Sequence, residues 1–312
     1  MRRTVALGAS LGAVVTVILA GVLAAAPAEG PAARAVTAPE PSAGVEAGAA
    51  SSRRRARSLS RVEVRRFASD ALGRSMPYLV FVPPGYETEP DRRYPTLYLL
   101  HGDGGNDHQW VETGIIDEAE RLIRSGEIEP LIIVMPEGER GYWVDHANNG
   151  PRWGTYVAVD LIANVQRTYR ARPGREHRAI GGLSMGAHGA TQLALNFPGT
   201  YAAVGAHSLV LRRFGSAPAF FGNAVQFSLR DLMTLIYGSV GLARGTALWS
   251  DIGDKDPWVP LARQYHRTLG DLQIPHAWYE WPGDHSGRYW GAYVGDYLRF
   301  YDGAIGRVAS LN

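Results

Sequence analysis

The chain of 312 residues contains no cysteine, which excludes disulfide bonds, a cysteine nucleophile and thiolate metal sites. Lys255 is the single lysine, so Schiff-base chemistry would depend on one residue and is not expected. The net charge is only +2 and part of the positive charge lies in one N-terminal tail, so no nucleic-acid partner is expected.

The first 28 residues have the pattern of an export signal. Arg2 and Arg3 precede an apolar run at residues 5–26, and Ala-Pro-Ala at residues 26–28 matches a cleavage site. The run is also long enough to span a membrane. A retained N-terminal anchor at residues 5–26 is therefore the alternative to a cleaved signal peptide, and membrane contact is expected only there. Either way, the protein is expected to be secreted or extracytoplasmic.

Residues 29–60 are rich in Ala, Pro, Gly, Ser, Glu and Arg and nearly lack large apolar side chains. Such a segment cannot bury enough surface to offset the entropy lost on ordering. A disordered linker is therefore expected between the N-terminal segment and the folded domain.

From residue 61 onward, short apolar runs alternate with helical patterns. The expected strands are residues 78–82, 96–100, 131–135, 178–183, 204–207, 247–252 and 276–281, and the expected helices are residues 115–123, 155–169, 185–196 and 288–304. The alternation predicts an α/β catalytic domain over residues 61–312, with a mostly parallel central sheet and helices on both faces. Ligands bind beyond the carboxyl ends of the strands in such sheets.

Residues 209–245 interrupt this alternation. They carry several Phe, Leu and Ile side chains without the alternation of a strand. Two interpretations stay open: an excursion that packs on the core, or a cap whose apolar side walls an acyl pocket.

The sequence Gly-Leu-Ser-Met-Gly at residues 182–186 matches the pattern G-x-S-x-G. The pattern alone is weak evidence, because residues 8–12 match it inside the N-terminal apolar run. Ser184, however, follows an expected strand and precedes an expected helix, which is the context of a nucleophile elbow. We therefore predict Ser184 as a catalytic nucleophile. His188 lies one turn into that helix, and whether it packs or reaches the substrate stays open.

A serine hydroxyl is a poor nucleophile without a base, and behind a nucleophile elbow the base comes late in the chain. His285 lies in a loop just past the strand at residues 276–281, at the carboxyl edge of the sheet. His207 precedes the acid candidates, His266 lies within a helix, and His276 begins a strand at its amino end. The prediction for the base is therefore His285.

The acid that orients the base should also follow a strand. Residues 250–257 supply Asp251, Asp254 and Asp256, of which Asp251 is expected within the strand itself. Asp256 is favoured as the carboxylate that fixes the histidine tautomer, because it lies deeper in the loop and directly before the next helix. Asp254 is the alternative.

Stabilisation of an oxyanion needs two backbone N–H donors. One is expected from Met185, the residue after the nucleophile, and the other from the glycine-rich loop at residues 101–105. Asp103 is assigned as the second donor, because neighbouring glycines let its N–H aim inward. His101 is expected to orient this loop rather than to act as a catalyst.

The loop at residues 141–153 also follows a strand and mixes aromatic with polar side chains. Its candidate substrate contacts are Trp143, Asp145, His146 and Trp153. No metal site is expected, because the histidines here lack ligand spacing, and no cofactor is expected.

The order of these motifs resembles that of a known family. The motifs are YLLHGDGG, VMPEG, AIGGLSMGAHGA, NFP, AAVGAHS, DIGDKDP and PGDHSGRYW, within residues 62–305. Together they resemble the "Putative esterase" family of α/β-hydrolases. That family includes esterase D and other S-formylglutathione hydrolases, enterochelin-esterase-like enzymes, feruloyl and acetylxylan esterases, and mycolyltransferases of the antigen 85 type.

The resemblance implies an α/β-hydrolase fold with a triad of Ser184, His285 and an aspartate of the Gly-Asp-Lys-Asp loop, and the G-x-x-D spacing supports Asp256. It also implies that Asp103 and Met185 are the oxyanion donors. Residues 187–188, Ala-His, depart from many members and leave the subfamily open. The cysteine-bearing, cytosolic branch that hydrolyses glutathione thioesters does not match, and the export signal argues against it.

The favoured function is an exported serine carboxylic-ester hydrolase that forms an acyl-enzyme intermediate. The alternative is an acyltransferase that uses the same triad to pass an acyl group to a sugar or lipid hydroxyl. A non-catalytic binding module is disfavoured by the intact order of the motifs. The substrate is expected to be a small-molecule, polysaccharide or lipid ester, and the protein to be a monomer.

Overall fold

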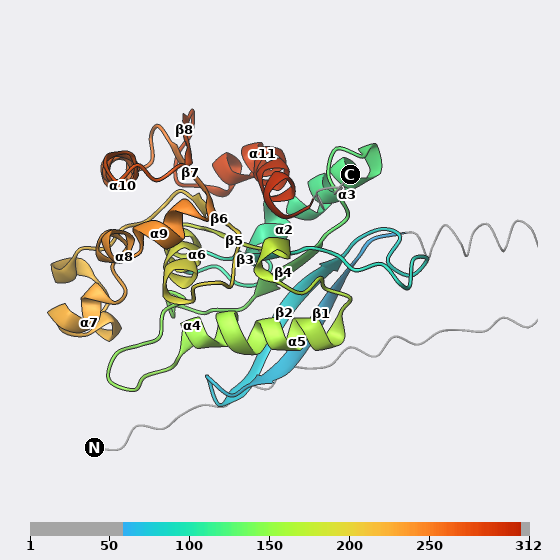
Figure 1. Ribbon diagram of the computed structural model, residues 1–312, viewed down its shortest axis with the longest axis horizontal. Helices are drawn as coiled ribbons and strands as arrows, with labels where there is room; N and C mark the ends of the chain where they lie inside the picture. The colour runs from blue at the N-terminus through green and yellow to red at the C-terminus, as the bar shows by residue number, and fades with distance from the viewer. Residues whose placement is uncertain (1–58, 307–312) are drawn as a thin grey trace, which may run out of the picture. The chain divides into compact units, whose positions relative to one another are not determined.

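The structure is a computed structural model that describes residues 59–306. The expected signal peptide or anchor at residues 1–28, and nearly all of the expected linker at residues 29–60, lie outside the described residues. Between residues 59 and 306, none of the helices has the length and apolarity needed to cross a lipid bilayer. The described residues form a central sheet with helices packed against it (Figure 1).

Eight strands form the sheet, in the spatial order β1-β2-β4-β3-β5-β6-β7-β8. Their bounds are β1 Arg61–Ser69, β2 Arg74–Val82, β3 Thr96–Leu100, β4 Ile132–Pro136, β5 Arg178–Leu183, β6 Ala203–His207, β7 Ala247–Gly253 and β8 Ala277–Trp281. All pairs from β4 to β8 are parallel, while β1–β2 and β2–β4 are antiparallel. The predicted mostly parallel sheet is confirmed, and strands β3 to β8 end at one common edge.

Helices cover both faces of this sheet, as predicted. Their bounds are α2 Gln109–Glu112, α3 Ile115–Ser125, α4 Trp153–Thr155, η1 Tyr156–Leu161, α5 Ile162–Thr168, η2 Arg175–His177, α6 Met185–Asn196, η3 Phe214–Ser216, η4 Ala219–Phe221, α7 Ala224–Ser228, α8 Leu232–Gly238, α9 Val240–Arg244, α10 Val259–Asp271 and α11 Gly287–Ile305. The single helix expected at residues 155–169 is the continuous run of α4, the π-helical η1 and α5.

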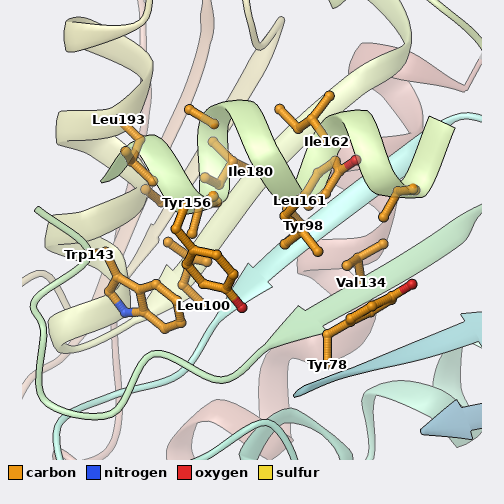
Figure 2. Packing of buried hydrophobic residues seen from close by; sticks show 14 of the residues in the cluster. Tyr78, Tyr98, Leu100, Val134, Trp143, Tyr156, Leu161, Ile162, Ile180 and Leu193 are labelled. Carbon is orange, nitrogen blue, oxygen red and sulfur yellow. The ribbon is translucent and has the colours of Figure 1, made fainter. Parts of the chain in front are cut away.

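The core has two layers because successive side chains of a strand point to opposite faces. In β3, Tyr98 and Leu100 pack toward η1, α5 and α6, whereas Leu97 and Leu99 pack toward α3 and α11. Figure 2 shows the first layer, in which Tyr98 and Leu100 lie beside Tyr156. The second layer matters for the site, because α11 carries several tyrosines onto the ends of β5, β6 and β7.

Strand β1 has no counterpart among the strands expected from the sequence. It pairs over its full length with β2, yet Val62 and Val64 are 41% and 69% exposed. Most of its other side chains are charged or exposed as well. Backbone pairing rather than burial therefore holds this edge strand. Because hydrophobic patterns in a sequence indicate burial, this strand was not predicted.

The segment at residues 209–245 forms the short helices η3, η4, α7, α8 and α9. Phe221, Leu232 and Ile236 are buried against the main body, which fits the interpretation of an excursion that packs on the core. Val225 and Tyr237 are 76% and 61% exposed. The interpretation of this segment as a wall of an acyl pocket stays a prediction.

Candidate active site

Ser184 lies in the sharp turn between β5 and α6, with φ 57° and ψ −116°. Positive φ is unusual for a residue with a side chain and marks a strained backbone that the surroundings must hold. The flanking residues must be glycines because a side chain at either position would clash with neighbouring backbone atoms. A Cβ at Gly182 would lie 2.2 Å from the carbonyl carbon of Gly186, and a Cβ at Gly186 would lie 2.1 Å from the oxygen of Leu100. The G-x-S-x-G spacing thus permits β3, β5 and α6 to meet.

The structure brings Ser184, His285 and Asp256 into one chain of hydrogen bonds. His285 Nε2 lies 2.8 Å from Ser184 Oγ, and His285 Nδ1 lies 2.6 Å from Asp256 Oδ2. Since the Asp256 carboxylate can only accept, Nδ1 carries the proton and Nε2 is free to accept from the serine hydroxyl. Asp256 is 3% exposed, and its other oxygen accepts from Trp258 N at 2.9 Å.

Asp254, the alternative acid, has a different contact. Its Oδ1 accepts from Gly283 N at 2.9 Å, and its own N–H donates to Trp281 O at 2.8 Å. Lys255 N donates to Gly283 O, also at 2.8 Å. These three bonds join the loop after β7 to the loop after β8, so Asp254 fastens the loop that carries His285 without touching the imidazole.

The glycine-rich loop after β3 lies against the nucleophile. A Cβ at Gly102 would lie 3.3 Å from Ser184 Cβ. The N–H of Gly102 donates to Gln109 Oε1 at 2.7 Å and is therefore occupied, so Asp103 stays the predicted donor of this loop. The N–H of Met185 is the first of α6 and has no acceptor within the helix. Met185 follows Ser184 in the chain, and Asp103 follows Gly102, which lies against Ser184. The oxyanion role of the Met185 and Asp103 N–H groups stays a prediction.

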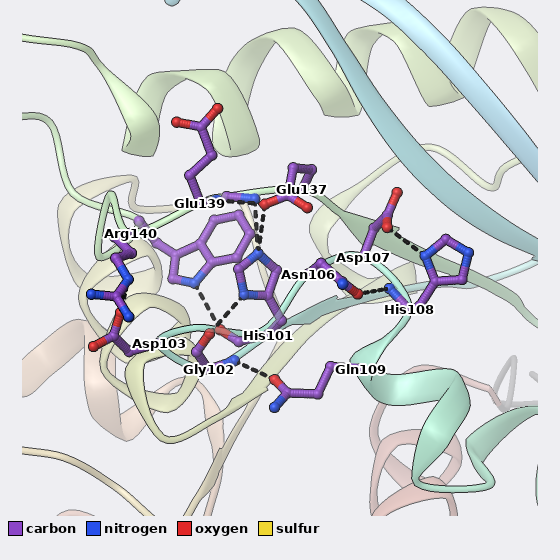
Figure 3. Close-up of polar contacts among 12 residues, drawn as sticks. His101, Gly102, Asp103, Asn106, Asp107, His108, Gln109, Glu137, Glu139 and Arg140 are labelled. Carbon is purple, nitrogen blue, oxygen red and sulfur yellow. Dashed lines mark hydrogen bonds and ion pairs between the residues drawn. The ribbon is translucent and has the colours of Figure 1, made fainter. Parts of the chain in front are cut away.

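The side chain of His101 contacts the backbone of this loop (Figure 3). It is 1% exposed, its Nε2 lies 2.9 Å from Gly138 N, and its Nδ1 lies 2.8 Å from Gly102 O. Trp143 Nε1 donates to His101 O at 3.1 Å. Burial alone would raise the pKa of Glu137, but its polar contacts, among them the hydrogen bond from the Glu139 N–H, lower that pKa below its ordinary value. The contacts fit the predicted loop-orienting position of His101.

The burial of Trp143 and Trp153 argues against the predicted contact of these two residues with substrate. They are 0% and 3% exposed and have no face to offer a ligand. Three glycines make room for them: a Cβ at Gly138 or Gly189 would lie 2.2 or 2.5 Å from Trp143, and one at Gly141 would lie 2.5 Å from Trp153. Both tryptophans fill the core between the loop at residues 141–153 and α6.

Asp145 and His146 hold their own loop. Asp145 accepts from the N–H and the hydroxyl of Thr155 at 2.9 and 2.7 Å. The ring of His146 stacks on Phe220 at 4.0 Å, and its Nε2 lies 3.1 Å from Gly141 O. Burial lowers the pKa of His146, despite the opposing effect of that carbonyl. Contact of either residue with substrate stays a prediction.

His188 is 1% exposed and packs beside the elbow. Its Nδ1 lies 3.3 Å from Val210 O and its Nε2 lies 3.0 Å from Arg230 O. It therefore links α6 to two points of the segment at residues 209–245. Burial lowers the pKa of His188 to about 4, which the two carbonyls only partly offset.

Sequence reasoning missed a group at the same edge of the sheet. Arg212 Nε donates to Tyr142 OH at 2.7 Å, and its guanidinium lies 5.1 Å from the ring centre of Trp258. Each of these residues belongs to a loop that follows a strand, and this position in the sequence could have identified them as candidates. Burial raises the pKa of Tyr142, and the nearby Arg212 opposes that effect. Within residues 59–306, no cluster of three His, Asp or Glu side chains could hold a metal ion.

The fold and the hydrogen-bonded chain at its carboxyl edge define an α/β-hydrolase. A family model named Esterase, with the description "Putative esterase", matches residues 69–300, and the chain belongs to this family. An esterase of Mycobacterium tuberculosis is 28% identical over 254 residues, which cover 70% of this chain and 54% of the relative. An acetyl esterase of Caldicellulosiruptor saccharolyticus is 25% identical over 169 residues, which cover 51% of this chain and 60% of the relative.

Solved structures share the fold. A ferulic acid esterase has a TM-score of 0.72 and 25% identity, and the match covers 79% of this chain and 99% of that chain. An S-formylglutathione hydrolase from Staphylococcus aureus has a TM-score of 0.67 and 20% identity, with 78% and 98% covered. The chain spans between half and two thirds of the length of the first curated relatives, so their activities are not transferred to it as they stand.

Proposed function

We propose that this protein is a serine carboxylic-ester hydrolase with Ser184 as nucleophile, His285 as base and Asp256 as the acid that orients the base. The observation that supports it most is the continuous chain from Ser184 Oγ through the imidazole to the Asp256 carboxylate, at 2.8 and 2.6 Å. Membership of the esterase family and the likeness to a ferulic acid esterase agree with it.

The proposed reaction has two steps. His285 Nε2 removes the hydroxyl proton as Ser184 Oγ attacks the ester carbonyl, and the same imidazolium then protonates the leaving alcohol. The N–H groups of Met185 and Asp103 stabilise the oxyanion, helped by the N-terminal end of α6. Water, activated by His285, then hydrolyses the acyl-enzyme.

The test is the variant Ser184→Ala. We expect it to lose turnover of p-nitrophenyl acetate and butyrate by about 10⁴-fold or more, and to lose labelling by an organophosphate. Ser216→Ala removes an exposed serine of η3 and is the matched control, with wild-type rates expected. A Ser184→Ala protein that keeps full turnover would contradict the proposal.

The substrate class is proposed as an ester of a carboxylic acid, including aryl esters, since one structural neighbour at 25% identity is a ferulic acid esterase. A panel of p-nitrophenyl esters of increasing acyl length, together with methyl ferulate, tests this. Adding glycerol or trehalose and analysing the products separates hydrolysis from acyl transfer. Free acid as the main product supports the hydrolase, and an acylated acceptor as the main product supports the transferase.

We also propose that the chain is exported and that residues 1–28 act as its signal. Arg2, Arg3 and the apolar run that follows support this. Mass spectrometry of the protein recovered from an exporting bacterial host tests the proposal. A mature N-terminus near residue 29 is expected, whereas an intact, membrane-bound chain would point to the anchor.

A further inference from the structure

A second carboxylate lies at the end of β7, buried beneath the candidate active site. Asp251 is 0% exposed and accepts four hydrogen bonds. Its Oδ1 accepts from Trp249 Nε1 at 2.7 Å and from His207 Nδ1 at 2.6 Å. Its Oδ2 accepts from Tyr289 OH at 2.9 Å and from Tyr297 OH at 3.0 Å. The proposed chemistry uses none of these five residues.

This cluster holds the backbone of the nucleophile. His207 is the last residue of β6, and its carbonyl accepts from Ser184 N at 2.9 Å, while its imidazole binds Asp251. The next residue, Ser208, donates its N–H to Asp251 O at 2.8 Å. Since Ser184 has a strained φ of 57°, the bond to its N–H is one of the contacts that can hold the turn in place.

The same cluster holds the loop that carries the base. Tyr289, in the first turn of α11, packs on this loop so closely that a Cβ at Gly283 would lie 2.5 Å from its ring. Trp290, the next residue, packs edge-on against His285 with ring centres 5.3 Å apart, and its Nε1 donates to Ser208 Oγ at 3.0 Å. Two adjacent aromatic side chains therefore connect the base loop to the ends of β6 and β7.

A third tyrosine of α11 extends the cluster to β5. Tyr301 OH lies 2.9 Å from His207 Nε2. A Cβ at Gly181 or Gly205, which pair across β5 and β6, would lie less than 2 Å from that hydroxyl. The sheet therefore has two facing glycines where the tyrosine hydroxyl reaches the histidine. Burial and the negative charge of Asp251 hold the pKa of Tyr301 well above its ordinary value, so the hydroxyl keeps its proton.

We propose that Asp251 is a positioning residue that fixes where Ser184 and His285 lie relative to each other. It acts on the serine through His207 and on the loop that carries His285 through Tyr289. It touches neither the reacting atoms nor the triad, so it is not a catalytic residue. The inference deepens the proposed function and depends on it. A misplacement of reacting groups by about 1 Å can cost about 100-fold in rate, so a bond network of this kind can be measured in turnover.

Two tyrosines provide a matched pair for the test. Tyr289 and Tyr297 both donate to Asp251 Oδ2 at nearly equal distances, but only Tyr289 packs on the base loop. Tyr289→Phe keeps that packing and removes the bond. We expect kcat for p-nitrophenyl butyrate to fall about tenfold with KM within about twofold, since binding groups are unchanged. Tyr297→Phe is expected to lose a similar amount of stability and to keep kcat within about twofold.

Asp251 itself is tested with a graded series. Asp251→Asn keeps the volume and part of the hydrogen bonding, and Asp251→Ala keeps neither, so kcat should fall from Asp to Asn to Ala. Asp160→Asn, a half-buried carboxylate on η1 that binds Ser69, is the control and should keep wild-type kcat. If the Asp251 variants do not fold, the comparison of Tyr289→Phe with Tyr297→Phe decides alone. Equal kcat in those two variants overturns the inference.

The two proposals fail in different ways. A wild-type protein with Ser184-dependent turnover, together with an unaffected Tyr289→Phe, overturns the positioning role and leaves the hydrolase intact. A wild-type protein without Ser184-dependent turnover overturns the hydrolase, and the positioning role with it. Unfolding midpoints measured on every variant distinguish a loss of the fold from a displacement of Ser184 and His285 within an intact fold.

Discussion

Ser184 occupies a conformation that most residues avoid, and the contacts around it explain how the fold maintains it. The adjacent glycines remove two clashes, His207 O accepts the serine N–H, and α6 begins at the next residue. A backbone φ of 57° in a non-glycine residue costs on the order of 1–3 kcal/mol. The surroundings must therefore be tightly packed, and all residues of α6 from Met185 to Leu195 are buried.

Gly186→Ala tests this crowding. Its Cβ would lie 2.1 Å from Leu100 O, a backbone atom that cannot move aside. We expect a loss of about 2–4 kcal/mol in the free energy of unfolding, or failure to fold, measured by chemical denaturation. Gly303→Ala, at an exposed helical site of α11 with open space around it, is the control and should raise stability by about 0.5–1 kcal/mol.

Asp256→Asn and Asp254→Asn distinguish the two acid candidates. The amide at position 256 favours the wrong tautomer of His285, so kcat should fall by about 10⁴-fold with the fold intact. Asp254→Asn weakens one bond to Gly283 N, and its kcat should fall by less than about tenfold. Steady-state kinetics with an activated ester measures both. A larger loss at Asp254 than at Asp256 would reverse the assignment.

At the scale of residues, two features of the sequence were sufficient to select Ser184, His285 and Asp256, which the structure brings together. These features are the order of the candidate residues in the chain and their positions just after predicted strands. The burial of the tryptophans at positions 143 and 153 was not predicted, because a loop of mixed aromatic and polar residues has the same composition whether it binds a ligand or fills a core. Glycines at spatially adjacent positions were the missing signal, and their proximity is visible only in three dimensions.

Among the elements, the segment at residues 209–245 is attached in part to α6. His188 offers two ring nitrogens to two carbonyls, Val210 O and Arg230 O, although a neutral imidazole has one N–H to donate. Burial keeps the ring neutral at neutral pH. The attachment of this segment to α6 at His188 therefore combines one good hydrogen bond with the packing of Phe221 on the ring.

This burial makes stability depend on pH. The pKa of His188 is about 4 in the folded protein and about 6.5 in an unfolded chain, so the unfolded chain binds more protons between those values. His188 should therefore reduce the free energy of unfolding by about 2 kcal/mol between pH 7.5 and pH 5. His188→Gln should lose that share of the pH dependence in urea titrations.

The strands differ in how well the sequence predicts them. Strands β3 and β5 are buried on both faces and were predicted with their observed bounds. Strand β1 forms from residues that mostly remain exposed, and the antiparallel edge it makes with β2 was not expected. A buried strand needs apolar side chains, which can be recognised in the sequence. Pairing along an edge is made by backbone N–H and C=O groups that every sequence has, so it gives no such pattern.

For the whole molecule, the proposed triad and both layers of the core described above lie within residues 59–306. A chain that starts at residue 59 should therefore fold and hydrolyse p-nitrophenyl butyrate with a kcat/KM within about twofold of the full chain. Kinetics and size-exclusion chromatography measure this, and a monomer is the expected species. Loss of the fold on truncation would show that residues 1–58 contribute to stability.

The bonds between the loops after β7 and β8 have a consequence for how such a protein can change. Asp254 and Lys255 join the acid loop to the base loop, so these two loops tolerate new residues only if they change together. The segment after β6 is attached by apolar packing and by hydrogen bonds at His188, Arg212 and Arg230, and it contains none of Ser184, Asp256 and His285. Insertions selected for a new substrate should therefore accumulate after β6, and laboratory evolution of this scaffold should begin there.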